Sequence, residues 1–231
     1  MPNWCYQHAE VRGSNAQLRR FIDAIRIEKT PEWEALPSYE RIDWDLNQLF
    51  PIPNELHETV SGGYAPNDDG TKSEKQIALE EQREKNIAKY GHKDWYDWAL
   101  ANWDTKWGAC QVSFDEDTFD DTSTSIHLYW ESAWGPAVGL IKKISEQFDE
   151  LLFGFHMTEE ANFFAGYVVI HAGEVETDFE HDMDGMPEYD EDDEKWEDKY
   201  SEWNDKLIFE LAEGLKKEMD SYQLANEELF K

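Results

Sequence analysis

The order of strand-like and helix-like segments in this 231-residue sequence predicts an α+β fold. Two amphipathic helical segments, after residues 14 and 136, each lie between strand-like segments. A dense block of aromatic residues between them predicts a further short helix that must be buried. A split β-α-β arrangement, the ferredoxin-like sandwich, explains this order with the fewest assumptions.

The first part of the chain predicts a strand, a helix and a second strand. The first strand is expected at Asn3 to Val11, and the second at Trp44 to Phe50, before Pro51-Ile52-Pro53. Between them, Ser14 and Gln17 form a capping box. The apolar positions that follow it at helical spacing are Leu18, Phe21, Ile22 and Ile25.

A surface insertion is predicted at about residues 57–90. Ser61 to Lys72 is rich in Gly, Asn and Asp, which indicates an exposed loop. A capping box at Ser73–Gln76 then begins a polar helix, for which Ile77 and Ile87 are the expected buried edge.

The aromatic block from Tyr90 to Ala109 predicts a helix that begins at Trp95. Asp94 stands at its N-cap position, and Asp97 follows three residues later. Because apolar rings cover most of its circumference, we interpret this helix as a core wedge and not as a ligand-binding motif. The side chains assigned to the wedge are Trp95, Trp98, Asn102, Trp103 and Trp107.

The second half predicts a helix among several strands. The helix is expected to begin at Pro136 and to bury Val138, Ile141, Ile144 and Phe148. The expected strands are Ala109–Phe114, Ser125–Trp130, Phe153–Thr158, Phe163–His171 and Val175–Phe179.

Composition and charge exclude several classes of function. Against 52 acidic residues the chain has 21 basic ones, a net charge of −31, which repels nucleic acid and anionic membranes. We therefore expect a basic partner, with no direct contact to nucleic acid or membrane. No apolar segment approaches the roughly 20 residues of a membrane span, so a cytoplasmic protein is expected. Cys5 and Cys110 match no zinc or disulfide spacing, which predicts buried reduced thiols.

Several short motifs together resemble one family. They are Met1-Pro-Asn-Trp-Cys5, Phe50-Pro-Ile-Pro-Asn-Glu-Leu56, the block Tyr90 to Trp107, Trp130-Glu-Ser-Ala-Trp134 and Phe164-Ala-Gly166 with Gly173. Over residues 1–178 the chain resembles the YubB ferredoxin-like family of phages and plasmids. The resemblance implies a ferredoxin-like fold in a mobile-element protein, and it implies no catalytic residue. The sequence departs from the family pattern at Asp104, where glycine is implied, and at Gly108, where an acidic residue is implied.

We predict two parts, a ferredoxin-like domain at residues 1–178 and an acidic helical extension at residues 179–231. From Glu174 onward the chain has 22 acidic and 6 basic residues. Apolar residues recur every three or four positions, which predicts one helix from about Tyr189 to Met219. Between Glu188 and Asp205 a net charge of −8 over 18 residues would place one charge per roughly 3.4 Å of helix. A single DNA strand carries about the same density.

Three interpretations of the acidic extension remain open. It can mimic nucleic acid and bind a basic host protein, it can be a solvated surface, or it can pair with the arginines of the first helix. The residues assigned to partner binding are Asp190, Glu191, Asp193, Glu194, Glu197, Asp198, Glu202 and Asp205.

The segment Glu180 to Glu191 is spaced like a calcium loop. Its candidate ligands are Asp182, Asp184, Glu188 and Glu191. A glutamate at the first position, Pro187 at the eighth and a preceding strand argue against a cation site. We interpret the segment as an acidic linker, and we expect no metal and no cofactor.

No catalytic motif is present in the sequence. His92, Asp94 and Lys106 surround the wedge, and three further histidines fall on predicted strands, but no fixed spacing connects them. These are His127, His156 and His171. We therefore predict a non-enzymatic phage or mobile-element protein that inhibits a basic, nucleic-acid-binding host protein through a DNA-like acidic surface, in counter-defence. The alternative is a small-molecule-binding or hydrolytic domain with a pocket between the wedge and the sheet.

Overall fold

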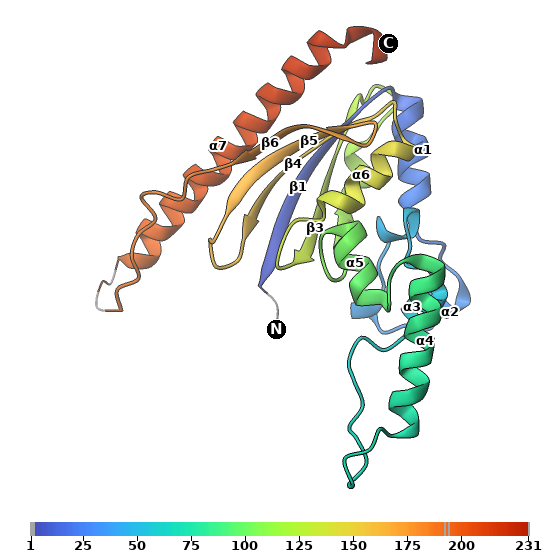
Figure 1. Cartoon of the computed structure of the whole chain (residues 1–231). Coiled ribbons are helices and arrows are strands. Elements are labelled where there is room, and N and C mark those ends of the chain that lie inside the picture. The colour runs from blue at the N-terminus through green and yellow to red at the C-terminus, as the bar shows by residue number, and fades with distance from the viewer. Residues whose placement is uncertain (1–2, 192, 194, 231) are drawn as a thin grey trace.

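The computed structural model describes residues 3–191, 193 and 195–230, and its centre is one antiparallel sheet (Figure 1). The six strands lie in the order β2-β3-β1-β4-β5-β6. Their bounds are β1 Trp4–Arg12, β2 Cys110–Phe114, β3 Ser125–Ala133, β4 Leu152–Glu159, β5 Ala165–His171 and β6 Glu174–Glu180. The first four strands form the split β-α-β order of a ferredoxin-like sandwich, which confirms the predicted fold class.

Helices α1 (Asn15–Ile25) and α6 (Val138–Gln147) cover one face of this sheet (Figure 1). The predicted capping box begins α1: the Ser14 hydroxyl accepts from the Gln17 N–H, and the Gln17 side chain accepts from the Ser14 N–H. The main core lies between these helices and the strands. Its large, fully buried side chains include Phe21, Trp130, Phe155, Leu18, Leu140 and Ile141.

Helix α7 (Trp196–Ala225) lies on the opposite face and covers β4 and β5. A second apolar cluster attaches it there, formed by Leu207, Leu211, Leu215 and Met219 with Leu152, Ala165, Tyr167 and Val169. The helix approaches the sheet closely because Gly154 has no side chain, since a Cβ at this position would collide with the Met219 sulfur.

A long insertion between α1 and β2 holds the other helices. Their bounds are α2 Pro31–Ala35, η1 Ser38–Glu40, η2 Asn47–Leu49, α3 Asn54–His57, α4 Glu74–Tyr90 and α5 Trp95–Trp103. Two further short turns are η3 Glu116–Thr118 and η4 Glu227–Phe230.

The predicted strand at Trp44–Phe50 is wrong. Trp44 forms only an isolated bridge with Arg26, and the next residues turn into η2. Trp44 and Leu46 are buried alternately, which imitates a strand pattern. At Asn47, however, the side chain and not the backbone pairs with Ala109, donating to its carbonyl at 2.8 Å and accepting from its N–H at 2.9 Å.

The aromatic wedge is buried only in part. Trp98 and Trp103 of α5 lie in the main core, and Trp95 is half-buried. Trp107 is 37% exposed, so its assignment to the core is wrong. The reason is that α5 ends at Trp103 and Asp104 after it has a left-handed φ of 62°, so Trp107 lies beyond the helix and does not continue its buried face. The resemblance implied glycine at position 104, the residue that adopts this conformation most readily.

The two cysteines are free thiols. Cys5 is buried and Cys110 is half-buried. Burial raises the pKa of Cys5 to about 12 and that of Cys110 to about 11, so both thiols remain protonated at neutral pH.

Candidate functional site

Helix α7 begins later than the sequence predicts, at Trp196 and not near Tyr189. Before it, the Asp193 carboxylate accepts from the Lys195 N–H at 3.0 Å. This local side-chain bond stabilises a turn in place of a helical backbone. Of the assigned partner-binding residues, Asp190, Glu191 and Asp193 therefore precede the helix. Glu194 lies outside the described residues.

The later start lowers the charge density along the helix. Trp196 to Asp205 carries four carboxylates and Lys199, or −3 over ten residues. At about 1.5 Å per residue this is one charge per roughly 5 Å. The helix is therefore less densely charged than the single DNA strand to which the sequence compared it.

An aromatic row fixes the beginning of α7. Trp196 stacks on Tyr200 with ring centroids 5.2 Å apart, and Trp203 follows at 6.0 Å from Tyr200. The Tyr200 hydroxyl accepts from the Asn162 side-chain amide at 2.6 Å, at the β4–β5 turn. These contacts hold one side of the helix against the molecule and leave the other side to solvent.

The carboxylates on the solvent side are unpaired. Glu197, Asp198, Glu202 and Asp205 are exposed, and no lysine or arginine of the described chain forms an ion pair with them. Asp198, Glu202 and Asp205 follow one another at four and three residues, so they share one face of the helix. This face is an available anionic surface, which we call the α7 acidic face.

Within the described residues the arginines of α1 pair with carboxylates outside the acidic extension, which contradicts that interpretation. Arg19 pairs with Asp121 at 2.5 Å, and Arg20 pairs with Glu150. Arg26, just beyond α1, holds Glu116 at 2.6 Å. One basic side chain from elsewhere does reach α7: Arg12 of β1 contacts Asp220 at 2.6 Å.

Part of the negative charge from Glu174 onward has a structural explanation. Strand β6 is an edge of the sheet, and its carboxylates are exposed. They are Glu174, Glu176, Asp178 and Glu180. Like charges along an edge oppose the addition of a further strand, so this part of the charge protects the sheet against aggregation.

The calcium-like segment does not form a cation site. Glu180 belongs to β6, and the Asp182 carboxylate accepts from the Asp184 N–H at 3.0 Å as in an ordinary turn. Among the residues whose placement is described, no group of three His, Cys, Asp or Glu side chains could hold a metal ion.

An open groove of about 750 Å³ lies beside the wedge. Trp95, Trp103 and Trp107 line one side, and the segment from Asp45 to His57 lines the other. The groove therefore lies between the wedge and the segment from Asp45 to His57, and not between the wedge and the sheet as the alternative expected. Lys106 also lines it, with its ammonium 4.2 Å from the centre of the Trp107 ring.

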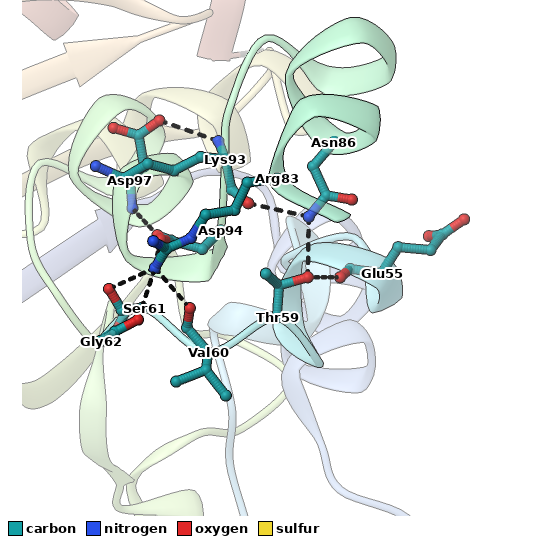
Figure 2. A network of polar contacts seen from close by, with 10 residues as sticks. All are labelled: Glu55, Thr59, Val60, Ser61, Gly62, Arg83, Asn86, Lys93, Asp94 and Asp97. Atoms are coloured by element: carbon teal, nitrogen blue, oxygen red, sulfur yellow. Dashed lines mark hydrogen bonds and ion pairs between the residues drawn. The ribbon is translucent and has the colours of Figure 1, made fainter. Parts of the chain in front are cut away.

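The polar residues around the wedge form a structural junction (Figure 2). Asp94 is buried, caps α5 by accepting from the Asp97 N–H at 3.0 Å, and pairs with Arg83 at 3.2 Å. The same Arg83 nitrogen donates to three carbonyls of the preceding loop, those of Val60, Ser61 and Gly62. His92 lies 3.5 Å from Asp97. Asp94 is thus committed to structure, and no hydrolytic arrangement of His92, Asp94 and Lys106 forms.

A buried asparagine completes this junction. Asn86 of α4 is 2% exposed and donates to the Thr59 hydroxyl at 2.9 Å and to the Lys93 carbonyl at 3.0 Å (Figure 2). The sequence predicted Ile77 and Ile87 as the buried edge of this helix, but they are 46% and 52% exposed. Helix α4 is attached through polar groups, which hydrophobic periodicity does not detect.

The strand histidines occupy different environments. His156 and His171 are buried, whereas His127 is exposed. His156 stacks on His8, a residue that the sequence did not single out, with ring centroids 5.1 Å apart. Strand register brings the two together, and register is not readable from either segment alone.

Comparison with known proteins gives two matches. Residues 102–199 match a family model described as a ferredoxin-like domain in Api92-like protein. A crystal structure of protein api92 from Yersinia pseudotuberculosis aligns over 79% of this chain and 99% of that chain, with 12% identity and a TM-score of 0.47. No curated protein matches the chain. The matched family model is named after Api92-like proteins. The resemblance to the YubB family and the origin from a mobile element stay predictions.

None of the helices in the described ranges is both long and apolar enough to cross a membrane.

Proposed function

We propose that this chain is a non-enzymatic binding protein that occupies a basic, nucleic-acid-binding surface of another protein through the α7 acidic face. The observation that carries the proposal is the set of unpaired carboxylates on a helix whose opposite side is firmly attached. A fixed anionic surface attracts a basic partner and suppresses binding of acidic ones. The resemblance to phage and plasmid proteins favours a host protein as partner and counter-defence as the purpose.

A charge-neutral variant tests this proposal. It combines Glu197→Gln, Asp198→Asn, Glu202→Gln and Asp205→Asn, and its binding to a nine-residue lysine peptide is measured at rising salt. We expect at least a tenfold loss of affinity, since four exposed charge contacts of about 0.5 kcal/mol each sum to about 2 kcal/mol. Duplex DNA should compete with this chain for a basic DNA-binding protein.

A matched control removes four exposed charges elsewhere. It combines Glu58→Gln, Glu74→Gln, Glu81→Gln and Glu84→Gln, all in the insertion. We expect less than a threefold loss of affinity for this control. Equal losses in both variants would mean that only the net charge matters and that the α7 acidic face is a solvated surface.

A second candidate function is small-molecule binding in the open groove beside the wedge, which Trp95, Trp103 and Trp107 line. The groove volume of about 750 Å³ lies within the range of ligand pockets, and Lys106 forms no ion pair with any described residue. A co-purifying small molecule that resists high salt and is lost in Trp95→Ala would support this function. The absence of any such molecule by mass spectrometry would count against it.

A further inference from the structure

The face of the sheet that carries α7 is covered over only part of its width. Helix α7 packs on β4 and β5, while β1 and β3 extend beyond it (Figure 1). Because side chains alternate along a strand, Tyr6 and His8 of β1 lie on this face, as do His127 and Tyr129 of β3. His8 and His127 are exposed, and the two tyrosines are half-buried.

Three rings form a row across this face. In the strand register His8 stands opposite both Tyr129 and His156. The His8 ring centre lies 4.9 Å from that of Tyr129 and 5.1 Å from that of His156. A hollow of about 200 Å³ lies between the His8 and His156 rings of this row and α7, whose Ala212 and Lys216 line it. We call the Tyr129–His8–His156 rings the ring row.

Carboxylates surround the ring row. The Tyr129 hydroxyl donates to Glu131 at 2.8 Å. Burial and then the carboxylates of Glu160 and Glu131 raise the pKa of Tyr6, which shows that these charges act on this face. The Glu10 side chain lines the hollow together with His8 and His156.

The ring row itself carries no charge at neutral pH. Burial lowers the pKa of His8 and lowers that of His156 to about 4, so both imidazoles are neutral. Lys216 is the one cation that lines the hollow, and Arg12 nearby is neutralised by Glu10 and Asp220. The surface therefore combines neutral rings with flanking negative charge.

We propose that this open face is the docking surface for an arginine-bearing segment of the basic partner. The guanidinium stacks on Tyr129 and His8, and the Glu131 carboxylate beside Tyr129 attracts it. This inference rests on the proposed function, to which it adds the contacts that select the partner. A planar guanidinium stacks on rings better than a lysine ammonium does. Nucleobases stack on such rings too, but a net charge of −31 opposes their phosphates.

The test compares two peptides of equal charge by isothermal titration calorimetry, nine arginines and nine lysines. We expect the arginine peptide to bind about five- to tenfold more tightly, since two ring contacts contribute. The double variant His8→Ser, Tyr129→Leu should reduce this preference below about twofold and leave the lysine peptide unaffected. Because Tyr129 is half-buried, His8→Ser alone serves as the second variant, and Tyr64→Leu in the insertion is the matched control.

The variant Lys216→Glu tests whether the ligand of this surface is a cation or an anion. It should strengthen binding of both peptides, whereas weaker binding would identify an anion site and overturn the inference. Single-stranded oligothymidine binding that Tyr129→Leu abolishes would also overturn it. If both peptides bind equally and the ring variants change nothing, the docking surface is wrong while the proposed function stands. If neither peptide binds, the proposed function fails and this inference fails with it.

Discussion

Two long surface helices, α4 and α7, are attached to the molecule by opposite kinds of contact. Helix α7 is attached by a stripe of buried apolar side chains, among them Leu207 and Leu211. Helix α4 buries Asn86 and half-buries Arg83, whose hydrogen bonds hold the loop before it and the start of α5. Its exposed isoleucines contribute little.

The difference has a physical consequence. Apolar burial is non-directional and grows with area, so α7 tolerates adjustment as long as its stripe stays covered. Buried polar groups must keep every partner, because an unpaired one costs about 1–3 kcal/mol. We therefore expect the attachment of α7 to contribute more to the free energy of unfolding than that of α4. We expect the hydrogen bonds of α4 to fix its position more strictly. Four measurements test this contrast between the two helices, and they are given in descending order of the expected change.

The largest effect should come from Trp98 of α5, which lies in the main core. Trp98→Ala should reduce the free energy of unfolding by about 3–5 kcal/mol, since it leaves a cavity. Urea unfolding measures this loss. Leu100→Ala, on the exposed side of the same helix, should change it by less than about 0.5 kcal/mol. A loss below about 1 kcal/mol for Trp98→Ala would show that the wedge is not a core element.

The apolar attachment of α7 should come next. Leu211→Ala should cost about 2–5 kcal/mol, because Leu211 is fully buried between α7 and the sheet. Hydrogen exchange should show the loss first in the amides of α7. Phe209→Ala is the control, since Phe209 is 64% exposed. Equal protection of α7 in both variants would contradict an apolar attachment.

The sequence predicted the elements whose signals are local. Capping boxes placed α1 and α4, and the apolar stripe of α7 was recognised from Leu207 onward. It failed at Trp44–Phe50, where the Asn47 side chain replaces a strand pairing with Ala109. That contact joins residues 62 positions apart, and no local pattern encodes it.

The candidate sites were predicted only in part for the same reason. The acidic residues of α7 were found from composition, but the start of the helix depended on a turn at Asp193. The ring row of Tyr129, His8 and His156 was missed, because it requires the register of three strands. Composition and period are local properties, whereas register is set by the whole sheet.

Acid should lower the free energy of unfolding through His156, which lines the hollow beside α7. Burial lowers the pKa of His156 from 6.5 to about 4, so the fold favours the neutral ring. This contribution is complete above pH 6.5 and is lost as the pH falls towards 4, about 2 kcal/mol between pH 7 and 5. His8, His127, Glu10 and Lys216 also face the hollow beside it.

Urea unfolding at pH 7 and pH 5 tests the role of His156 by comparing the unaltered chain with His156→Phe, whose side chain cannot titrate. We expect the variant to lose about 2 kcal/mol less than the unaltered chain between pH 7 and 5. The many carboxylates titrate in both proteins, so their effect cancels in the difference. An equal loss in both would mean that His156 is hydrated in the fold.

The smallest effect should come from the polar attachment of α4. Asn86→Ala removes the donor to the Thr59 hydroxyl and the Lys93 carbonyl, and should cost about 1–2 kcal/mol. The cost stays below that of Leu211→Ala because little apolar area is exposed. Lys85→Ala, on the exposed side of the same helix, is the matched control and should cost less than about 0.5 kcal/mol. If Asn86→Ala costs more than Leu211→Ala, the polar junction is the stronger attachment, and the order of the two helices proposed above is reversed.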